Sequence, residues 1–296
     1  MKLLIFATHK DVSLFRIEDE ARNEHIEYQT IYFETLFIVG NDLWVQLDDK
    51  KRSHLAITPR DLLLIRWPFD ADDTQIEYNI FVHFLLIHYE MQVVFDRKCL
   101  QRFTPYYEDK LFQSFVFKHL TIPSPRVDYF KNSNQVRQSE TSFPLVFKKR
   151  VSSRSKNNFL VTSFSDLEKK LDDRVLTDYL FQEVVDIEYD VRVLAFKGTI
   201  LGAVNRFTHL REGNRLAVKG REVFSNIPDE VKEEIKRSMA FLGADFVGFD
   251  VLFTKDTKHF FIEANLSPQF DKFEEATGVN VAQVLIKEVH QAFEKA

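Results

Sequence analysis

Short apolar runs alternate with amphipathic stretches over the first hundred residues of the chain. Runs of strand length occupy residues 3–7, 62–66 and 93–96, and residues 77–89 repeat apolar positions at the spacing of a helix. Strands that alternate with helices are typical of a sheet with parallel strands. The pattern therefore predicts a small α/β domain at the start of the chain.

The pattern changes after residue 103. Thr104-Pro105 is a typical helix start, so a helix is predicted from there to about His119. The charged stretch 209–221 is predicted to be a surface loop. The remaining runs predict strands at 145–148, 159–161, 180–185, 190–196 and 200–206, and helices at 164–171, 228–242 and 281–293.

Two apolar runs near the carboxyl end carry acceptor side chains in their interior. Asp250 lies within residues 248–253, and Glu263 and Asn265 lie two positions apart in the next run. Side chains two apart on a strand share a face, so Glu263 and Asn265 project together. A hairpin that turns through residues 255–258 would bring Asp250 to the same face.

This set of side chains offers oxygen ligands only. Mg²⁺ prefers such ligands and usually takes one or two carboxylates, with water and substrate phosphates in its other positions. Charged groups inside strands rich in Phe and Val would otherwise be costly to bury. The alternative is a strand pair whose polar residues face solvent. The pattern favours a metal–nucleotide site.

Composition narrows the classes of function. The chain has 296 residues, enough for two or three subdomains, and a net charge of −5, which argues against a nucleic-acid partner. The single cysteine, Cys99, excludes an internal disulfide and favours a cytoplasmic location. No apolar run has transmembrane length, and residues 1–7 are too short for a signal peptide, so no membrane partner is expected. The 30 phenylalanines favour self-association as a homo-oligomer.

Several motifs resemble the RimK-type carboxylate–amine ligases of the ATP-grasp superfamily. Residues 248–252, 261–268 and 276–282 are similar to the family's V-D-V-L strand, its E-x-N-x-S-P strand and its A-T-G-x-D-I-A helix entry. Four shorter segments match more loosely, namely Asp109-Lys110, Pro144–Lys148, Gln182-Glu183 and Asp190–Arg192. The resemblance covers about residues 100 to 290.

The resemblance implies an α/β fold of the ATP-grasp type. An amino-terminal α/β subdomain, residues 1–103, would precede a central lobe, residues 104–181, and a carboxy-terminal lobe with the metal site, residues 182–296. ATP would lie between the last two lobes.

The resemblance also implies roles for particular residues. Asp250, Glu263 and Asn265 would hold two Mg²⁺ ions, for which Mn²⁺ could substitute. The nucleotide would be bound by Lys110 and Lys148 at the phosphates, by backbone groups of Glu183 and Val184 at the adenine, and by Asp190 and Arg215. The catalytic cations at the γ-phosphate and acyl-phosphate end would be Arg192, Arg206 and Lys219.

Each of these residues also has a structural interpretation. Lys148 opens a basic run, and Lys110 alone would be an exposed helix residue. Arg192 and Arg206 could pair with carboxylates across neighbouring strands. Arg215 and Lys219 could be solvated in a charged loop.

One segment departs from the family pattern. The loop that covers the triphosphate is usually rich in glycine, whereas residues 151–158 here contain Ser, Asn, Arg154 and Lys156 but no glycine. Side-chain donors and charge could replace the backbone donors of such a lid.

The chemistry implied is ATP-dependent amide formation. The γ-phosphoryl group of ATP would activate a carboxylate as an acyl phosphate, and an amine would displace phosphate. The substrate would be an amino acid, a peptide or a protein, and the sequence does not define which. Two alternatives are a small-molecule kinase with the same fold and a non-catalytic nucleotide-binding module, which the missing glycine-rich loop favours.

Overall fold

The computed structural model describes the chain in segments that form two compact units. The described residues are 1–7, 11–40, 42–47, 51–58, 60–66, 74–103, 108–139, 141–151, 158–171, 175–211 and 215–295. The first unit comprises Met1–Pro105 and Gln269–Ala296, and the second comprises Tyr106–Pro268. The predicted lid, residues 151–158, lies almost entirely outside the described residues.

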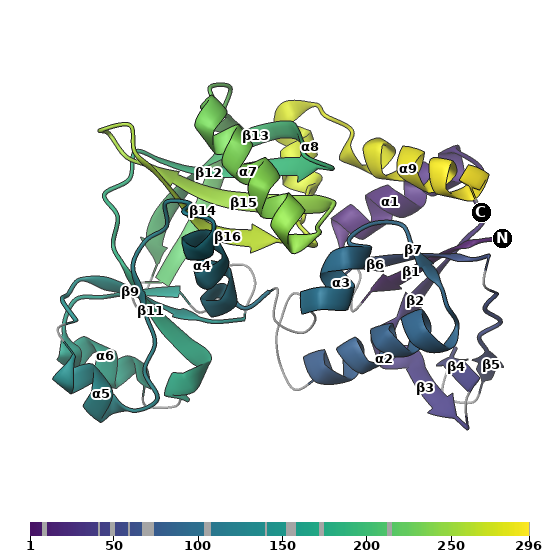
Figure 1. Ribbon diagram of the computed structural model, residues 1–296, viewed down its shortest axis with the longest axis horizontal. Helices are drawn as coiled ribbons and strands as arrows, with labels where there is room; N and C mark the ends of the chain where they lie inside the picture. Colours follow the sequence, from purple (N-terminus) through teal and green to yellow (C-terminus); the bar gives the residue numbers. More distant parts are fainter. Residues whose placement is uncertain are drawn as a thin grey trace. The chain divides into compact units, whose positions relative to one another are not determined.

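The first unit contains a parallel sheet in the order β2-β1-β6-β7 (Figure 1). All five residues of β1 are buried, as expected for a strand covered on both faces. This arrangement confirms the parallel α/β pattern predicted for the start of the chain, whereas the domain bounds 1–103 stay a prediction. Its strands and first helices are β1 (Leu3–Ala7), α1 (Val12–Asn23), β2 (Tyr28–Tyr32), β6 (Leu62–Arg66), α2 (Thr74–His88), β7 (Gln92–Val93) and α3 (Arg97–Phe103).

A small antiparallel sheet was not predicted. It follows a short 3₁₀ helix, η1 (Phe33–Thr35), and consists of β3 (Leu36–Val39), β4 (Asp42–Gln46) and β5 (Arg52–His54). Two of its strands contain short apolar runs, at residues 36–39 and 43–45, to which the sequence analysis gave no assignment, and few residues of the sheet are buried.

The last part of the chain belongs to the first unit. Helices α8 (Asp271–Thr277) and α9 (Val281–Lys295) contact α1. The compact units therefore group residues 269–296 with the amino-terminal part of the chain. The division into an amino-terminal subdomain and two nucleotide-binding lobes, at residues 1–103, 104–181 and 182–296, stays a prediction.

The second unit is built on one antiparallel sheet in the order β16-β15-β12-β13-β14-β10-β9-β11-β8. Its elements are β8 (Val127–Asp128), β9 (Leu145–Lys149), β10 (Asn158–Val161), β11 (Tyr179–Glu183), β12 (Tyr189–Phe196), β13 (Thr199–Arg211), β14 (Arg215–Val223), β15 (Phe246–Phe253), β16 (His259–Asn265), α4 (Lys110–His119), α5 (Ser133–Gln138), α6 (Phe164–Leu171), η2 (Leu176–Asp178) and α7 (Asp229–Leu242).

Two cores stabilise this sheet. Strands β9, β10 and β11 share one apolar cluster with helices α5 and α6, and Phe147 and Phe181 are its most deeply buried aromatic residues. Figure 1 shows α5 and α6 next to β9 and β11. At the other end α7 buries Val231, Ile235, Met239 and Leu242, the residues predicted to form its apolar face.

Two local predictions were wrong. Helix α4 begins at Lys110, because the Asp109 side chain accepts a hydrogen bond from the Leu111 N–H at 2.9 Å and caps the helix there. Thr104 and Pro105 lie outside the described residues. The predicted loop 209–221 instead belongs largely to the paired strands β13 and β14. Among the described helices, none has the length and apolarity needed to cross a membrane.

Candidate nucleotide and metal site

The β15–β16 hairpin brings the three predicted metal ligands to one end of the large sheet. Asp250 lies directly opposite Glu263, and Gly248 lies opposite Asn265. The hairpin turns where predicted, since the Thr254 N–H donates to the Lys258 carbonyl at 2.9 Å. A bulge shifts the register between Asp250 and Val251. The hairpin that the period-two pattern indicated is confirmed, whereas metal binding by it stays a prediction.

Gly248 allows the end of β16 to lie close to β15. A Cβ atom at this position would lie 2.8 Å from Pro268 Cβ and 3.1 Å from Leu194 Cδ2, both shorter than ordinary contacts. The Asn265 amide also donates to the Gly248 carbonyl at 3.3 Å. The absence of a side chain at Gly248 therefore helps to place Asn265 near Asp250.

Asp250 is a buried carboxylate held by two arginines. Arg192 binds it in a bidentate manner at 2.8 and 2.9 Å, and Arg206 Nη1 donates to Oδ2 at 2.8 Å. Burial alone would raise the pKa of Asp250, but the two guanidinium groups outweigh it and lower the pKa to about 2. Asp250 is therefore ionised at neutral pH.

Arg206 links Asp250 to a second carboxylate, Asp190, to which it also donates. Burial opposes the charge on Arg206, yet Asp190 and Asp250 together raise the pKa of this guanidinium. Burial raises the pKa of Asp190 above its ordinary value despite the contact with Arg206. Arg192 and Arg206 therefore pair with carboxylates across neighbouring strands, which is their structural interpretation in the sequence analysis. These pairs lie on the same face of the sheet as Glu263.

Two buried lysines join this polar cluster. Lys110, the first residue of α4, places Nζ 3.3 Å from Glu263 Oε1. Burial lowers the pKa of Lys148 to about 8, helped by the charge of Lys110 and opposed by Glu263 and Asp250. Both lysines have a relative exposure of 5%, so neither is the exposed surface residue considered as an alternative.

Glu108 is a further acidic residue at this site, and the sequence analysis did not identify it. Its Oε1 accepts a hydrogen bond from the Leu266 N–H at 3.1 Å. Burial, followed by the charge of Glu263, raises the pKa of Glu108 to about 7. Its position directly before Asp109-Lys110 is the only signal in the sequence that could have indicated it.

The predicted adenine segment lies at the end of β11. Glu183 and Arg126 exchange two hydrogen bonds of 3.0 Å, and Val184 beyond them is exposed. Residues 183–186 line a hollow of about 440 Å³ together with residues of the β15–β16 turn. The structure therefore leaves a surface hollow beside the segment assigned to adenine.

Two predicted residues cannot be placed by their side chains. Arg215 and Lys219 lie on β14, but their side chains fall outside the part of the chain that the structure describes. Their backbone belongs to a strand, so the interpretation of a solvated loop does not apply.

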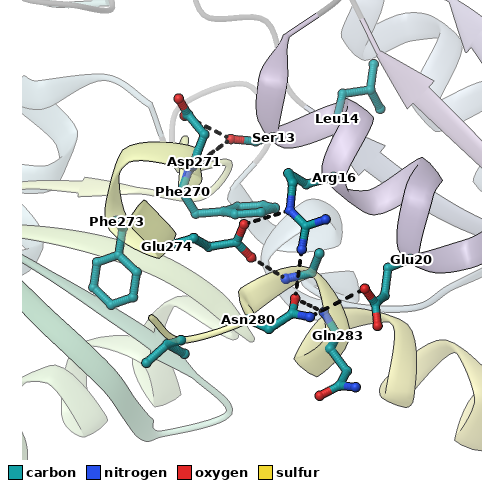
Figure 2. Close-up of polar contacts among 12 residues, drawn as sticks. Ser13, Leu14, Arg16, Glu20, Phe270, Asp271, Phe273, Glu274, Asn280 and Gln283 are labelled. Carbon is teal, nitrogen blue, oxygen red and sulfur yellow. Dashed lines mark hydrogen bonds and ion pairs between the residues drawn. The ribbon is translucent and has the colours of Figure 1, made fainter. Parts of the chain in front are cut away.

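The segment similar to the family's A-T-G-x-D-I-A motif has a structural role in the first unit (Figure 2). Asn280 precedes α9 and its Oδ1 accepts the Gln283 N–H at 3.0 Å, as a helix cap does. Arg16 of α1 donates to Asn280 at 3.2 Å and to Glu274 at 2.9 Å. Ser13 Oγ accepts the Phe270 N–H at 2.9 Å, at the start of α8. Asn280 of the motif, together with Glu274 and Phe270 before it, therefore holds α8 and α9 against α1.

Replacing Asn280 with alanine should loosen α9 from α1. The variant loses the helix cap and the contact with Arg16, so we expect a loss of about 1–2 kcal/mol in the opening free energy of α9. Hydrogen exchange of the α9 amides measures this quantity. The control is Asn132→Ala, since Asn132 caps α5 through Gln135 alone at 3.0 Å. Unchanged exchange in α9 would contradict the structural role of Asn280.

The metal site can be compared with what Mg²⁺ requires. In the described part of the chain, no three or more His, Cys, Asp or Glu side chains are grouped to hold a metal. The candidate set instead has two carboxylates and an amide oxygen, which fits Mg²⁺ because this ion takes few carboxylates and completes its shell with phosphate and water. The residues present therefore suit a metal that arrives with a nucleotide.

Comparison with known proteins defines the family. The sequence profile of the RimK-like ATP-grasp domain matches residues 115–289. Glutamate–LysW ligase ArgX of Sulfurisphaera tokodaii is 25% identical over 122 residues, covering 40% of this chain and 43% of that protein. Beta-citrylglutamate synthase B of Danio rerio is 30% identical over 149 residues, covering 48% of this chain and 36% of that protein. The matched region thus spans less than half of each relative.

The fold agrees with solved structures over nearly the whole chain. The ATP-grasp ligase PsnB, solved with a phosphomimetic variant of a minimal precursor, Mg and ADP, superimposes with a TM-score of 0.69 at 16% identity, covering 98% of both chains. The chain therefore belongs to the RimK-like ATP-grasp family. The family resemblance and the ATP-grasp fold class are both confirmed. ATP-grasp ligases use ATP and Mg²⁺.

Proposed function

We propose that this chain is an ATP-dependent carboxylate–amine ligase of RimK type. The observation that carries this proposal is the grouping of Lys110 and Lys148 with Asp250 and Glu263 on one face of the large sheet. Two cations and two carboxylates suit a metal–triphosphate complex, because the lysines contact phosphate and the carboxylates contact the ion. Membership of the family gives this grouping its chemical meaning.

The ions would be held by Asp250, Glu263 and Asn265, and we assign two Mg²⁺ to the site. When bound, Mg²⁺ neutralises the charge that develops on the transferred phosphoryl group. Asp250 Oδ2 accepts from both Arg192 and Arg206, whereas Oδ1 accepts from Arg192 alone among the described residues. Because a carboxylate oxygen has two lone pairs, Oδ1 can still accept the ion. Arg192 and Arg206 would thereby hold Asp250 ionised and oriented next to the ion.

The proposed amide formation has two steps. A substrate carboxylate oxygen attacks the γ-phosphorus, the bond to the β-γ bridging oxygen breaks, and ADP leaves. An amine nitrogen then attacks the acyl carbon, inorganic phosphate leaves, and the amine loses a proton to give the amide. Lys110 and Lys148 would bind the phosphates, and Arg192 would stabilise the γ-phosphate end. Residues 183 and 184 would bind adenine, and Asp190, Arg215 and Lys219 are assigned to the nucleotide and acyl-phosphate end.

The substrate class is proposed to be an amino acid or a peptide. This choice is supported by a relative that is a glutamate–LysW ligase and by the structural neighbour PsnB, which has also been solved with a precursor peptide. The net charge of −5 supports a partner other than nucleic acid. A cytoplasmic location and a homo-oligomeric state stay predictions.

A phosphate-release screen tests the function. The protein is incubated with ATP, Mg²⁺ and pools of amino acids and peptides, and mass spectrometry is run on each hit. We expect ADP, free phosphate and a product whose mass equals the two substrates less one water. A product that retains the phosphoryl group would instead identify a kinase. Tight ATP binding without turnover for any pool would favour a non-catalytic nucleotide-binding module.

A further inference from the structure

The strand that carries two of the proposed metal ligands is an edge strand. β16 ends the nine-stranded sheet and pairs with β15 on one side only. Backbone groups on the outer side of an edge strand need other partners, because unpaired buried N–H and C=O groups are costly. The partners of this edge therefore decide how firmly Glu263 and Asn265 are held.

The segment 108–123, which contains α4, supplies these partners. The Pro123 carbonyl accepts the Phe261 N–H at 2.8 Å, and Glu108 accepts the Leu266 N–H at 3.1 Å. Between them, Gln113 makes two bonds to Ala264: its amide nitrogen donates to the Ala264 carbonyl at 2.8 Å, and its amide oxygen accepts the Ala264 N–H at 3.1 Å. Gln113 has a relative exposure of only 2%.

The contact from Gln113 falls at the residue between the two ligands. A side-chain amide offers the same donor and acceptor as a peptide group, so Gln113 takes the place of a neighbouring strand at Ala264. This support is needed because the bulge between Asp250 and Val251 interrupts the ladder close by. Bulges redirect side chains, so the direction of Glu263 depends on how the backbone next to it is fixed.

We propose that Gln113 is a positioning residue that fixes Glu263 and Asn265 through the backbone of Ala264, with Glu108 adding a second contact at Leu266. The inference rests on the proposed function, since it concerns the metal site of that function. Residues that orient metal ligands from outside the first coordination shell typically change metal affinity by about 10–100-fold when mutated.

The test compares Gln113→Met with the unsubstituted protein in two measurements. Methionine keeps the length of the side chain and removes both hydrogen bonds. In the metal-free protein we expect faster hydrogen exchange at the Ala264 amide, with the Phe261 amide unchanged because Pro123 is its partner. In calorimetry with ADP, we expect the Mg²⁺ concentration for half-saturation to rise about 10–100-fold. Affinity for metal-free ADP should change less than twofold.

Two control variants separate positioning from a general loss of stability. Leu167→Ala empties part of the buried cluster under β9 and β11, far along the sheet from β16, and should leave the Mg²⁺ dependence unchanged. Ser114→Ala removes a neighbouring contact of α4, the 2.7 Å hydrogen bond that the Ser114 hydroxyl donates to the Leu111 carbonyl, and it should likewise leave the Mg²⁺ dependence unchanged. If Gln113→Met does not fold, Gln113→Asn, which shortens the amide by one methylene group, replaces it.

Three results would overturn the inference. In the first, Gln113→Met loses protection at Ala264 but keeps the Mg²⁺ dependence of the unsubstituted protein. In the second, Leu167→Ala raises the Mg²⁺ concentration for half-saturation by the same factor as Gln113→Met. If the unsubstituted protein shows no Mg²⁺-dependent ADP binding, both the proposed function and the inference are overturned. The first two results, by contrast, overturn only the inference.

Discussion

Replacing Glu263 with alanine is expected to abolish ADP release in the presence of substrate. Glu263 lies opposite Asp250 and contacts Lys110, so its loss removes a proposed ligand of the metal and the carboxylate partner of a lysine that is proposed to bind phosphate. Loss of one preorganised group that stabilises transition-state charge typically costs about 10²–10³-fold in rate, and a lost metal ligand adds to this. We therefore expect a decrease in turnover of at least about 10³-fold in a coupled ADP assay.

The matched control for this experiment is Glu233→Ala. Glu233 is an exposed residue of α7 that pairs with Lys236 at the surface, so its removal changes the net charge equally without affecting the site. Glu233→Ala should keep the turnover of the unsubstituted protein within about twofold, because exposed ion pairs contribute little. Full turnover by Glu263→Ala would remove the metal assignment.

The second large effect concerns the charge on Lys148. Burial and the charge of Lys110 lower the pKa of Lys148 to about 8. Below this pH the ammonium group is protonated and attracts the phosphates, and above it the group becomes neutral. We therefore expect kcat/KM for ATP to fall above pH 8, by about tenfold per pH unit, because kcat/KM reports ionisations of the free enzyme.

Variants at Lys148 test whether this lysine causes the fall in kcat/KM above pH 8. Lys148→Arg keeps a positive charge and should flatten the pH profile between pH 7 and 9. Lys148→Met should lower kcat/KM by about 10²–10³-fold at pH 7. The control is Lys149→Met, because side chains of adjacent strand residues point to opposite faces. A fall above pH 8 that persists in Lys148→Arg would assign the titration to another group.

The β15–β16 hairpin could be predicted from the sequence because its signal is local. Glu263 and Asn265 stand two apart in an apolar run, and the turn between the strands is only a few residues long, so the strand period alone places both side chains on one face. The start of α4 was placed wrongly because Thr104-Pro105 and Asp109 are both plausible caps, and only the structure shows that Asp109 caps the helix.

The rest of the site, and separately the packing of the first unit, depend on contacts between distant parts of the chain. Gln113 and Ala264 are 151 positions apart, and Ser13 and Phe270 are 257 apart, so no periodic pattern indicates either pair. The pairing of Arg206 with both Asp190 and Asp250 requires the order of three strands, which hydrophobic patterning does not define. The β13–β14 hairpin was taken for a loop because residues 209–221 carry many charged residues and have no period-two alternation, so only the backbone pairing shows the strands.

A crystal structure with Mg²⁺ and a non-hydrolysable ATP analogue would show where this chain binds the triphosphate and its ions. We predict Mg²⁺ at about 2.0–2.1 Å from oxygens of Asp250, Glu263 and Asn265, with the Lys110 and Lys148 ammonium groups in hydrogen-bond contact with the phosphates. The proposed site would be contradicted by a triphosphate bound elsewhere in the chain. It would also be contradicted by ions that phosphate and water coordinate without these three side chains.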